Sequence, residues 1–177
     1  MKKINLKHMV TAALCLALAL VLPFLTGQIP QIGKALAPMH LPVLLAGFLC
    51  GPWWAMAVGF IAPPLRFLLF SAPPFPGYVA MAFELAAYGL VSGLLYRRLP
   101  KTTPCLYGSL VGAMVAGRAV WGVAMTVILG LKGNAFGWAA FLSGAVFGAI
   151  PGIVVQLVLI PLLVVALHRA GYFQDEK

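Results

Sequence analysis

The chain has 177 residues, of which 63% are hydrophobic and 8% are charged, and its mean hydropathy is +1.03. This composition is typical of a protein that lies within a lipid bilayer, and it excludes a water-soluble domain, which would need far more polar surface. The formal net charge of +9 could suggest nucleic-acid binding, but membrane topology accounts for most of the basic residues, so we expect no nucleic-acid partner.

Six hydrophobic segments follow one another along the chain, separated by clusters of glycine and proline. A membrane-spanning helix needs roughly 20 apolar residues, and uncharged runs such as 35–65 and 133–167 are longer than that. Dividing the runs at these clusters gives segments near 8–25, 38–50, 52–71, 77–96, 104–131 and 137–168. We therefore predict an all-α integral membrane protein in which residues 1–177 form a single six-transmembrane-helix bundle.

The first two segments differ from ordinary spanning helices. The segment near 8–25 follows a basic start, as in a secretory signal, but no convincing cleavage pattern follows it, so we expect it to remain as the first helix. The short second helix, near 38–50, would be about 20 Å long at helical rise. We expect it to be shielded by its neighbours or to span the membrane only in part.

Basic residues predict the orientation of the bundle, because cytoplasmic loops and tails carry an excess of Lys and Arg. Six spans place Lys34 and Lys132 on one side of the membrane. The other side receives Lys2, Lys3, Lys7, Arg97, Arg98, Lys101, Arg169 and Lys177. We therefore predict that the N- and C-termini are cytoplasmic, in what is expected to be a bacterial cytoplasmic membrane.

Three charged residues lie inside the hydrophobic segments: Arg66, Glu84 and Arg118. Glu84 is the only acidic residue outside the last three positions of the chain. Each such charge costs roughly 2.5 to 3.5 kcal/mol at the centre of a spanning helix, and it usually faces a partner or a wet cavity. Counting about 1.5 Å per residue from the segment ends places all three at one level, in the outer half of the membrane.

Two interpretations of this charged level remain open. In the structural one, Glu84 pairs with one arginine while the other reaches toward the membrane surface. In the functional one, the three charges form a solute pocket open to the outside. A short turn joins the segments that carry Arg66 and Glu84, so Arg66 is the expected partner of Glu84. Arg118 would then meet an anionic ligand, and Tyr88 and Trp121, one turn from the charges, would wall the pocket.

The sequence offers no signal for catalysis. It has no phosphate-binding loop of the form GxxxxGK[ST], no HExxH and no GxSxG. His8, His40 and His168 lie at segment ends, and Cys15, Cys50 and Cys105 lack metal-ligand spacing. We therefore predict a protein that is not an enzyme and that uses neither a cofactor nor a metal.

Several stretches of the chain carry a resemblance to a known family. These are "AALCLALAL" in the first segment, "PMHLPVLLAGFLCGP", "VGFIAPPLRFLLF" and "MAFELAAYGLVSGLLYR". Together they resemble the substrate-binding S component of energy-coupling factor (ECF) transporters, with the most telling part in residues 38–98. The resemblance implies a six-helix subunit that captures a vitamin or related micronutrient from outside with high affinity.

The resemblance also implies partners. These are a transmembrane coupling subunit and two cytoplasmic ATPases, which dock on a small-residue pattern in the first helix that Ala13 and Ala17 match. An anionic vitamin is expected from the surplus positive charge, with pantothenate as the first choice and riboflavin-like, queuosine-precursor and cobalamin-type solutes still open. The alternative is a proton-coupled exporter that uses Glu84, although a cation site would avoid the two arginines.

Overall fold

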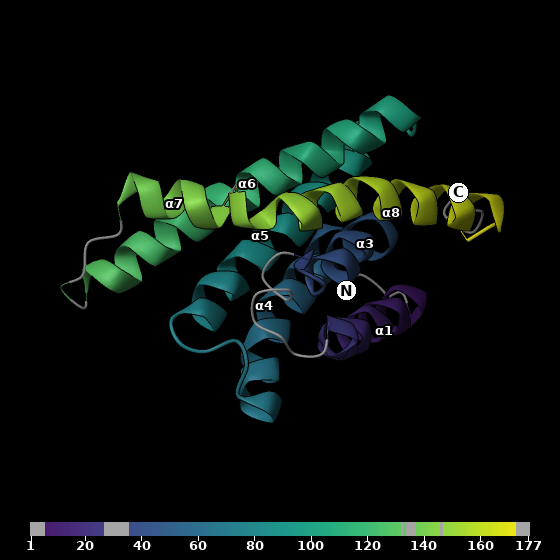
Figure 1. Ribbon diagram of the computed structural model, residues 1–177. Coiled ribbons are helices and arrows are strands. Elements are labelled where there is room, and N and C mark those ends of the chain that lie inside the picture. Colours follow the sequence, from purple (N-terminus) through teal and green to yellow (C-terminus); the bar gives the residue numbers. More distant parts are fainter. Residues whose placement is uncertain (1–5, 27–35, 132, 134–136, 146, 173–177) are drawn as a thin grey trace.

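Helices joined by turns make up the part of the chain that the computed structural model describes, which is residues 6–26, 36–131, 133, 137–145 and 147–172 (Figure 1). The elements are α1 (Leu6–Val21), the 3-10 helix η1 (Leu22–Thr26), α3 (His40–Cys50), α4 (Pro52–Phe70), α5 (Gly77–Arg98), α6 (Thr103–Gly130), α7 (Trp138–Ala145), the 3-10 helix η2 (Phe147–Ala149) and α8 (Ile150–Arg169). Five of the lysines used to predict the orientation of the bundle lie outside the described residues. These are Lys2, Lys3, Lys34, Lys132 and Lys177.

Five of these helices are long and apolar enough to cross a membrane, and α3 is a shorter apolar helix. An all-helical membrane protein with a short second helix is therefore confirmed. Nine of the eleven residues of α3 are buried, because the helix packs against α1, α4, α5 and α8. The bundle thus shields α3 from lipid, which permits an apolar helix too short to span the bilayer alone.

The last predicted segment, 137–168, is not one continuous helix. It is divided into α7, η2 and α8, and Pro151 lies in the first turn of α8. Glycine has low helix propensity and proline favours the first turn of a helix, so the sequence "SGAVFGAIPG" stops one helix and starts another. After this division α8 has 20 residues, which is about the length needed to cross the hydrocarbon core.

Close backbone contact holds α4 against α5. A side chain at Gly89 would meet the Ala55 carbonyl group at 2.5 Å, and a side chain at Gly59 would collide with the Leu85 carbonyl oxygen. In lipid no hydrophobic force drives helices together, so small residues that let backbones approach are what stabilises such a pair. This contact fixes the position of the first turns of α5, which carry Glu84.

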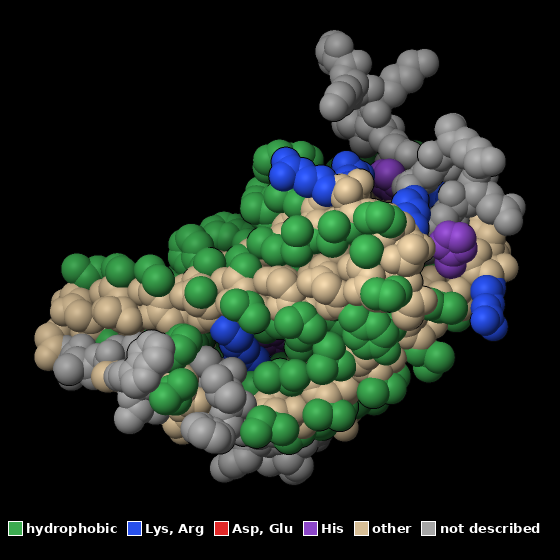
Figure 2. All heavy atoms as spheres, turned by 90° about the horizontal axis from the view of Figure 1, so that it is seen from above, with side chains coloured by type: hydrophobic (Ala, Val, Ile, Leu, Met, Phe, Trp, Pro, Cys, Tyr) green, Lys and Arg blue, Asp and Glu red, His purple; other side chains and the backbone are tan. Residues whose placement is uncertain are grey.

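Basic residues gather at one end of the bundle, where α1 and α6 begin and where α5 and α8 end (Figure 2). Lys7 at the start of α1 donates from Nζ to the Tyr172 carbonyl oxygen at 2.6 Å, and Thr11 Oγ1 lies 2.6 Å from the Tyr172 hydroxyl. These contacts tie the start of α1 to the chain beyond α8. That this end faces the cytoplasm stays a prediction from the positive-inside rule.

Candidate functional site

A buried polar cluster joins three helices around Glu84. Glu84 on α5 is only 1% exposed, and its Oε1 lies 2.9 Å from Arg118 Nη1 on α6 and 3.3 Å from His40 Nε2 at the start of α3. The contact between Glu84 and Arg118 agrees with the prediction that these two charges share one level. The cluster therefore holds one carboxylate, one guanidinium and one imidazole in a largely apolar core.

Tyr88, one turn along α5 from Glu84, forms a wall of this cluster. It is fully buried, and its ring contacts the His40 ring edge-on, with centroids 5.0 Å apart. Its hydroxyl is within electrostatic reach of both Glu84 and Arg118. A side chain at Gly117 would collide with the Tyr88 ring, so the glycine that precedes Arg118 makes room for this tyrosine.

Several polar atoms of the cluster have unused hydrogen-bonding capacity. Among the described residues, Arg118 Nε and both ring nitrogens of His40 have no hydrogen-bond partner, and the Tyr88 hydroxyl approaches the Arg118 side chain without meeting hydrogen-bond geometry. Glu84 Oε1 is close to Arg118 Nη1 and His40 Nε2 but does not meet hydrogen-bond geometry with a described residue. Buried polar groups are nearly always hydrogen-bonded, and an unsatisfied one costs about 1 to 3 kcal/mol. Such a concentration of unpaired groups is typical of a site whose partner is a ligand.

Gln156 on α8 is a further unpaired polar residue at this level. It is 0% exposed, and neither its Oε1 nor its Nε2 has a hydrogen-bond partner among the described residues. It lies about 20 Å along α8 from the basic end of the bundle, and Glu84 and Arg118 lie at nearly the same distance along α5 and α6. Because α8 packs on both α3 and α6, a ligand at the cluster could reach it.

His40 and Gln156 were missed by the reasoning from sequence. His40 was set aside because it lies at a segment end, yet the shortness of α3 brings that end to the level of Glu84. Gln156 carries no charge and so escaped a search for charged residues. The signal that could have found it is the single amide in the apolar stretch "IVVQLVLI".

Arg66 is not the partner of Glu84, so the predicted pairing was wrong. Its Nη1 donates to the Leu20 carbonyl oxygen at 2.7 Å, and its guanidinium lies over the rings of Phe24 and Phe70. Leu20 belongs to the last turn of α1, where carbonyl groups lack helical donors and attract cations. The Leu20 carbonyl at this helix end holds Arg66, and Glu84 pairs with Arg118.

The remaining predicted site residues occupy different surroundings. Trp121, one turn from Arg118, contacts Phe141 of α7 at 6.2 Å between ring centroids, and a side chain at Gly144 would meet its ring. Beside this contact an apolar cavity of about 470 Å³ lies between α6 and the start of α7. Ala13 and Ala17 are exposed on α1, whereas Ala12, Cys15 and Ala19 face the core. Trp121 as a ligand contact and the two alanines as a docking face stay predictions.

An all-helical bundle with several membrane-crossing helices and a polar cluster buried in its core defines a multi-pass membrane protein with an internal polar site. The sequence profile of the family described as "ECF transporter, substrate-specific component" matches residues 7–164 of the chain. The chain therefore belongs to this family and is the substrate-binding S component of an ECF importer. No curated protein and no solved structure matched it.

Membership of the family confirms three predictions. The chain is a transport subunit without enzymatic activity, it is a multi-pass protein of the cytoplasmic membrane, and its function involves a substrate and an energising module.

Proposed function

We propose that this S component captures its solute at the cluster formed by His40, Glu84, Tyr88, Arg118 and Gln156. The observation that carries the proposal is the set of buried polar atoms without hydrogen-bond partners on four different helices. A bound solute would satisfy these atoms, and its release would leave them unpaired again. Ligand sites of this kind are mostly apolar, with a few placed polar groups that fix orientation, and the core around Glu84 has that character.

The chemistry of the cluster favours a solute with both hydrogen-bond donors and acceptors. With Arg66 held at the end of α1, the cluster contains one carboxylate and one guanidinium, so it lacks the surplus positive charge on which the anionic prediction relied. Arg118 Nε and the Gln156 amide can bind a carboxylate or carbonyl group, and Glu84 and the Gln156 carbonyl can accept from hydroxyl or amide groups. Pantothenate carries all of these groups and stays our first choice among micronutrients.

The solute would enter from the side opposite the basic end and be delivered with the help of partner subunits. We infer that these are a transmembrane coupling subunit and two cytoplasmic ATPases, because this chain contains no nucleotide-binding loop of its own. Glu84, Arg118 and Gln156 lie about 20 Å from the basic end. A solute bound there is closer to the opposite surface of a hydrocarbon core about 30 Å thick.

Replacing Gln156 with Leu should separate ligand binding from stability. The change removes an amide that has no partner among the described residues and adds apolar volume of similar size, so thermal stability without ligand should be unchanged or higher. Affinity for the solute should fall at least about tenfold, the equivalent of one hydrogen bond of about 1.4 kcal/mol. Isothermal titration with a panel of micronutrients that includes pantothenate would measure it.

Ser92 offers a matched control for the Gln156 variant. It is also a buried polar residue, but its hydroxyl already donates to the Gly89 carbonyl oxygen at 3.2 Å. Ser92→Ala should leave solute affinity unchanged. If Gln156→Leu kept full affinity for every solute that the native protein binds, Gln156 would not belong to the site.

Replacing Ala13 or Ala17 with Trp should impair assembly with the energising module. Both residues are exposed on α1, and a bulky side chain would hold a docking helix away from its partner. Co-purification of the coupling subunit measures the effect, while solute affinity should stay within about threefold, or about 0.65 kcal/mol.

Ala12 provides the contrast for this prediction. It is only 3% exposed, so Ala12→Trp should destabilise the bundle itself and reduce solute binding through unfolding. Loss of solute affinity in Ala13→Trp with intact co-purification would place Ala13 in the internal packing and contradict a docking role.

A further inference from the structure

His40 lies beside a carboxylate that already has a cation as its partner. Its Nε2 is 3.3 Å from Glu84 Oε1, and the same oxygen lies 2.9 Å from Arg118 Nη1. The imidazole is buried, and neither of its ring nitrogens has a hydrogen-bond partner among the described residues. Because Arg118 alone balances the charge of Glu84, His40 is a second group at this carboxylate that can become a cation.

The charge balance of the cluster changes when an anion binds. Glu84 and Arg118 are together neutral, and histidine carries a charge only when it is protonated. An anionic group bound to Arg118 would leave one negative charge unbalanced in a buried core, which is strongly unfavourable. With a proton on His40, the cluster regains the surplus positive charge that an anion requires, and two cations then face two anions.

Arg118 is the member of the cluster that an anion can reach first. Its side chain is partly exposed, whereas the side chains of Glu84 and His40 are almost completely buried. Its Nε has no hydrogen-bond partner in the described part of the chain, and guanidinium groups bind carboxylates through paired N–H groups. A solute carboxylate would therefore compete with Glu84 for the same guanidinium, and His40 is placed to take over as the partner of Glu84.

The ionisable groups that meet His40 come from α5, one of four helices that pack on α3. They are Glu84 and Tyr88, whose ring contacts the imidazole edge-on. On α4, Arg66 is held by the Leu20 carbonyl oxygen of α1. A proton on His40 would thus meet one carboxylate, and within the described ranges the cation that shares this carboxylate is Arg118 of α6.

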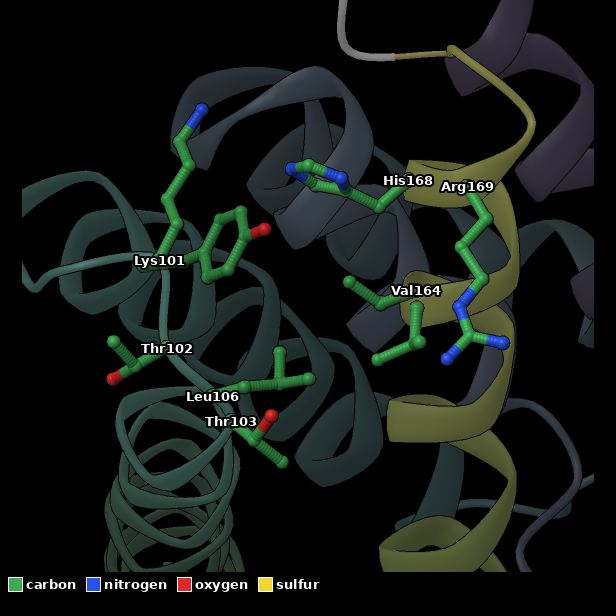
Figure 3. Close-up of a pocket in the computed structure, with 9 residues that line it drawn as sticks. Lys101, Thr102, Thr103, Leu106, Val164, His168 and Arg169 are labelled. Carbon is green, nitrogen blue, oxygen red and sulfur yellow. The ribbon is translucent and has the colours of Figure 1, made fainter.

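The remaining ionisable groups of α1, α5 and α8 have other partners or lie nearer the basic end of the bundle. Tyr78 is stacked on Phe67 of α4. Figure 3 shows His168 and Arg169 of α8 beside a cavity at the basic end, with Lys101 on its other side. The others are Lys7, His8, Cys15, Tyr96, Arg97 and Arg98.

We propose that the solute is a carboxylate and that it is captured together with one proton, which His40 takes from the solvent. The inference rests on the proposed function of the cluster. The solute carboxylate binds Arg118, and the protonated imidazole replaces Arg118 as the partner of Glu84. Release of the solute returns the proton to the solvent and restores the pair of Glu84 and Arg118. Histidine suits this exchange because its charge changes within the range of about pH 5 to 8.

The experiment is a calorimetric titration of the full-length protein in neutral detergent with pantothenate, repeated in buffers of different ionisation enthalpy. The dependence of the measured heat on the buffer gives the number of protons taken up per solute. Another carboxylate of the micronutrient panel replaces pantothenate if it binds more tightly, and panthenol, in which an alcohol replaces the carboxylate, is the neutral comparison. The test variant is His40→Gln. The control is His168→Gln, which removes a histidine at the basic end.

We expect the native protein to take up between about half a proton and one proton per pantothenate near pH 7.5, and none with panthenol. Pantothenate has no group that titrates near this pH, so the proton must go to the protein. Its affinity should fall at least about tenfold from about pH 6.5 to about pH 8.5, where one fully linked proton would give about 100-fold. His40→Gln should abolish both the uptake and the pH dependence, and His168→Gln should retain both.

A second measurement needs no solute. In Arg118→Gln, His40 is the described neighbour of Glu84 that can still become a cation. Because the folded state would then bind the proton, this variant should become more stable as the pH falls. Its unfolding equilibrium constant should be at least about tenfold lower at about pH 6.5 than at about pH 8.5. The double variant His40→Gln/Arg118→Gln should not show this gain.

Different results would overturn different claims. Solute binding that is weakened by Glu84→Gln or Arg118→Gln but takes up no proton would refute the role of His40 and leave the cluster as the solute site. Proton uptake that persists in His40→Gln would assign the proton to Glu84. A native protein that binds only neutral solutes would rule out the carboxylate. Unaltered solute affinity in all three single variants would instead contradict the proposed function itself.

Discussion

Replacing Arg118 with Gln is expected to lower the free energy of unfolding by about 3 to 5 kcal/mol, because it leaves Glu84 as a buried charge without a cation. Arg118 Nη1 lies 2.9 Å from Glu84 Oε1, and the Glu84 side chain is 2% exposed. His40, the other neighbour of this oxygen, carries charge only when protonated. Thermal unfolding in detergent, monitored with and without solute, would measure the loss.

Glu84→Gln should destabilise the protein less than Arg118→Gln does. The Arg118 side chain is 17% exposed and long enough to shift toward water when its partner is removed. The Glu84 side chain is 2% exposed and shorter, so its carboxylate cannot reach water in the same way. Both single variants should weaken solute binding. The double variant Glu84→Gln/Arg118→Gln should be more stable than the sum of the single losses predicts, because it removes both members of the pair.

Arg66→Gln is the informative comparison for this pair. Its guanidinium is buried against the Leu20 carbonyl oxygen, so the variant should lose stability while its remaining folded fraction binds solute normally. Equal losses of stability in Arg66→Gln and Arg118→Gln, with unaltered solute affinity in both, would mean that all three charges are structural. That result would contradict a solute site at Glu84.

Gly89→Ala is expected to destabilise the bundle by about 3 kcal/mol, at the upper end of the range for overpacked cores. The added carbon would lie 2.5 Å from the carbonyl carbon and oxygen of Ala55. These are backbone atoms of a neighbouring helix, so they cannot move aside as the end of a flexible side chain would. Because α4 and α5 would have to separate, solute affinity should fall as well.

Gly108 on α6 provides the matched control for Gly89. A side chain there would meet nothing within 4 Å. Gly108→Ala should therefore be neutral or stabilise the helix by up to about 1 kcal/mol, the difference in helix propensity. If Gly89→Ala were as stable as Gly108→Ala, the close contact of α4 and α5 would not limit the stability of the fold.

Much of the helical architecture could be predicted from the sequence because it depends on local rules. The apolar runs and the Gly/Pro clusters placed most helix ends within a few residues of those observed for α3, α4, α5 and α6. The exception was 137–168, because Gly148 and Pro151 were not among the glycine and proline clusters at which the chain was divided. The coincidence in depth of Glu84 and Arg118 also followed from helical rise, which every residue shares.

The sequence by itself determined that these are membrane helices and that Glu84 and Arg118 share one level, since both follow from composition and from a fixed rise per residue. Only the tertiary structure decided which charges meet. Arg66 lies on α4, which makes the most extensive contact with α5, yet the Leu20 carbonyl at the end of α1 holds its side chain. His40 meets Glu84 because α3 packs in the core of the bundle, and Gln156 is buried because α8 packs on α3 and α6. Rotation about the helix axis and side-chain direction depend on neighbouring helices far apart in the chain, and no local pattern encodes them.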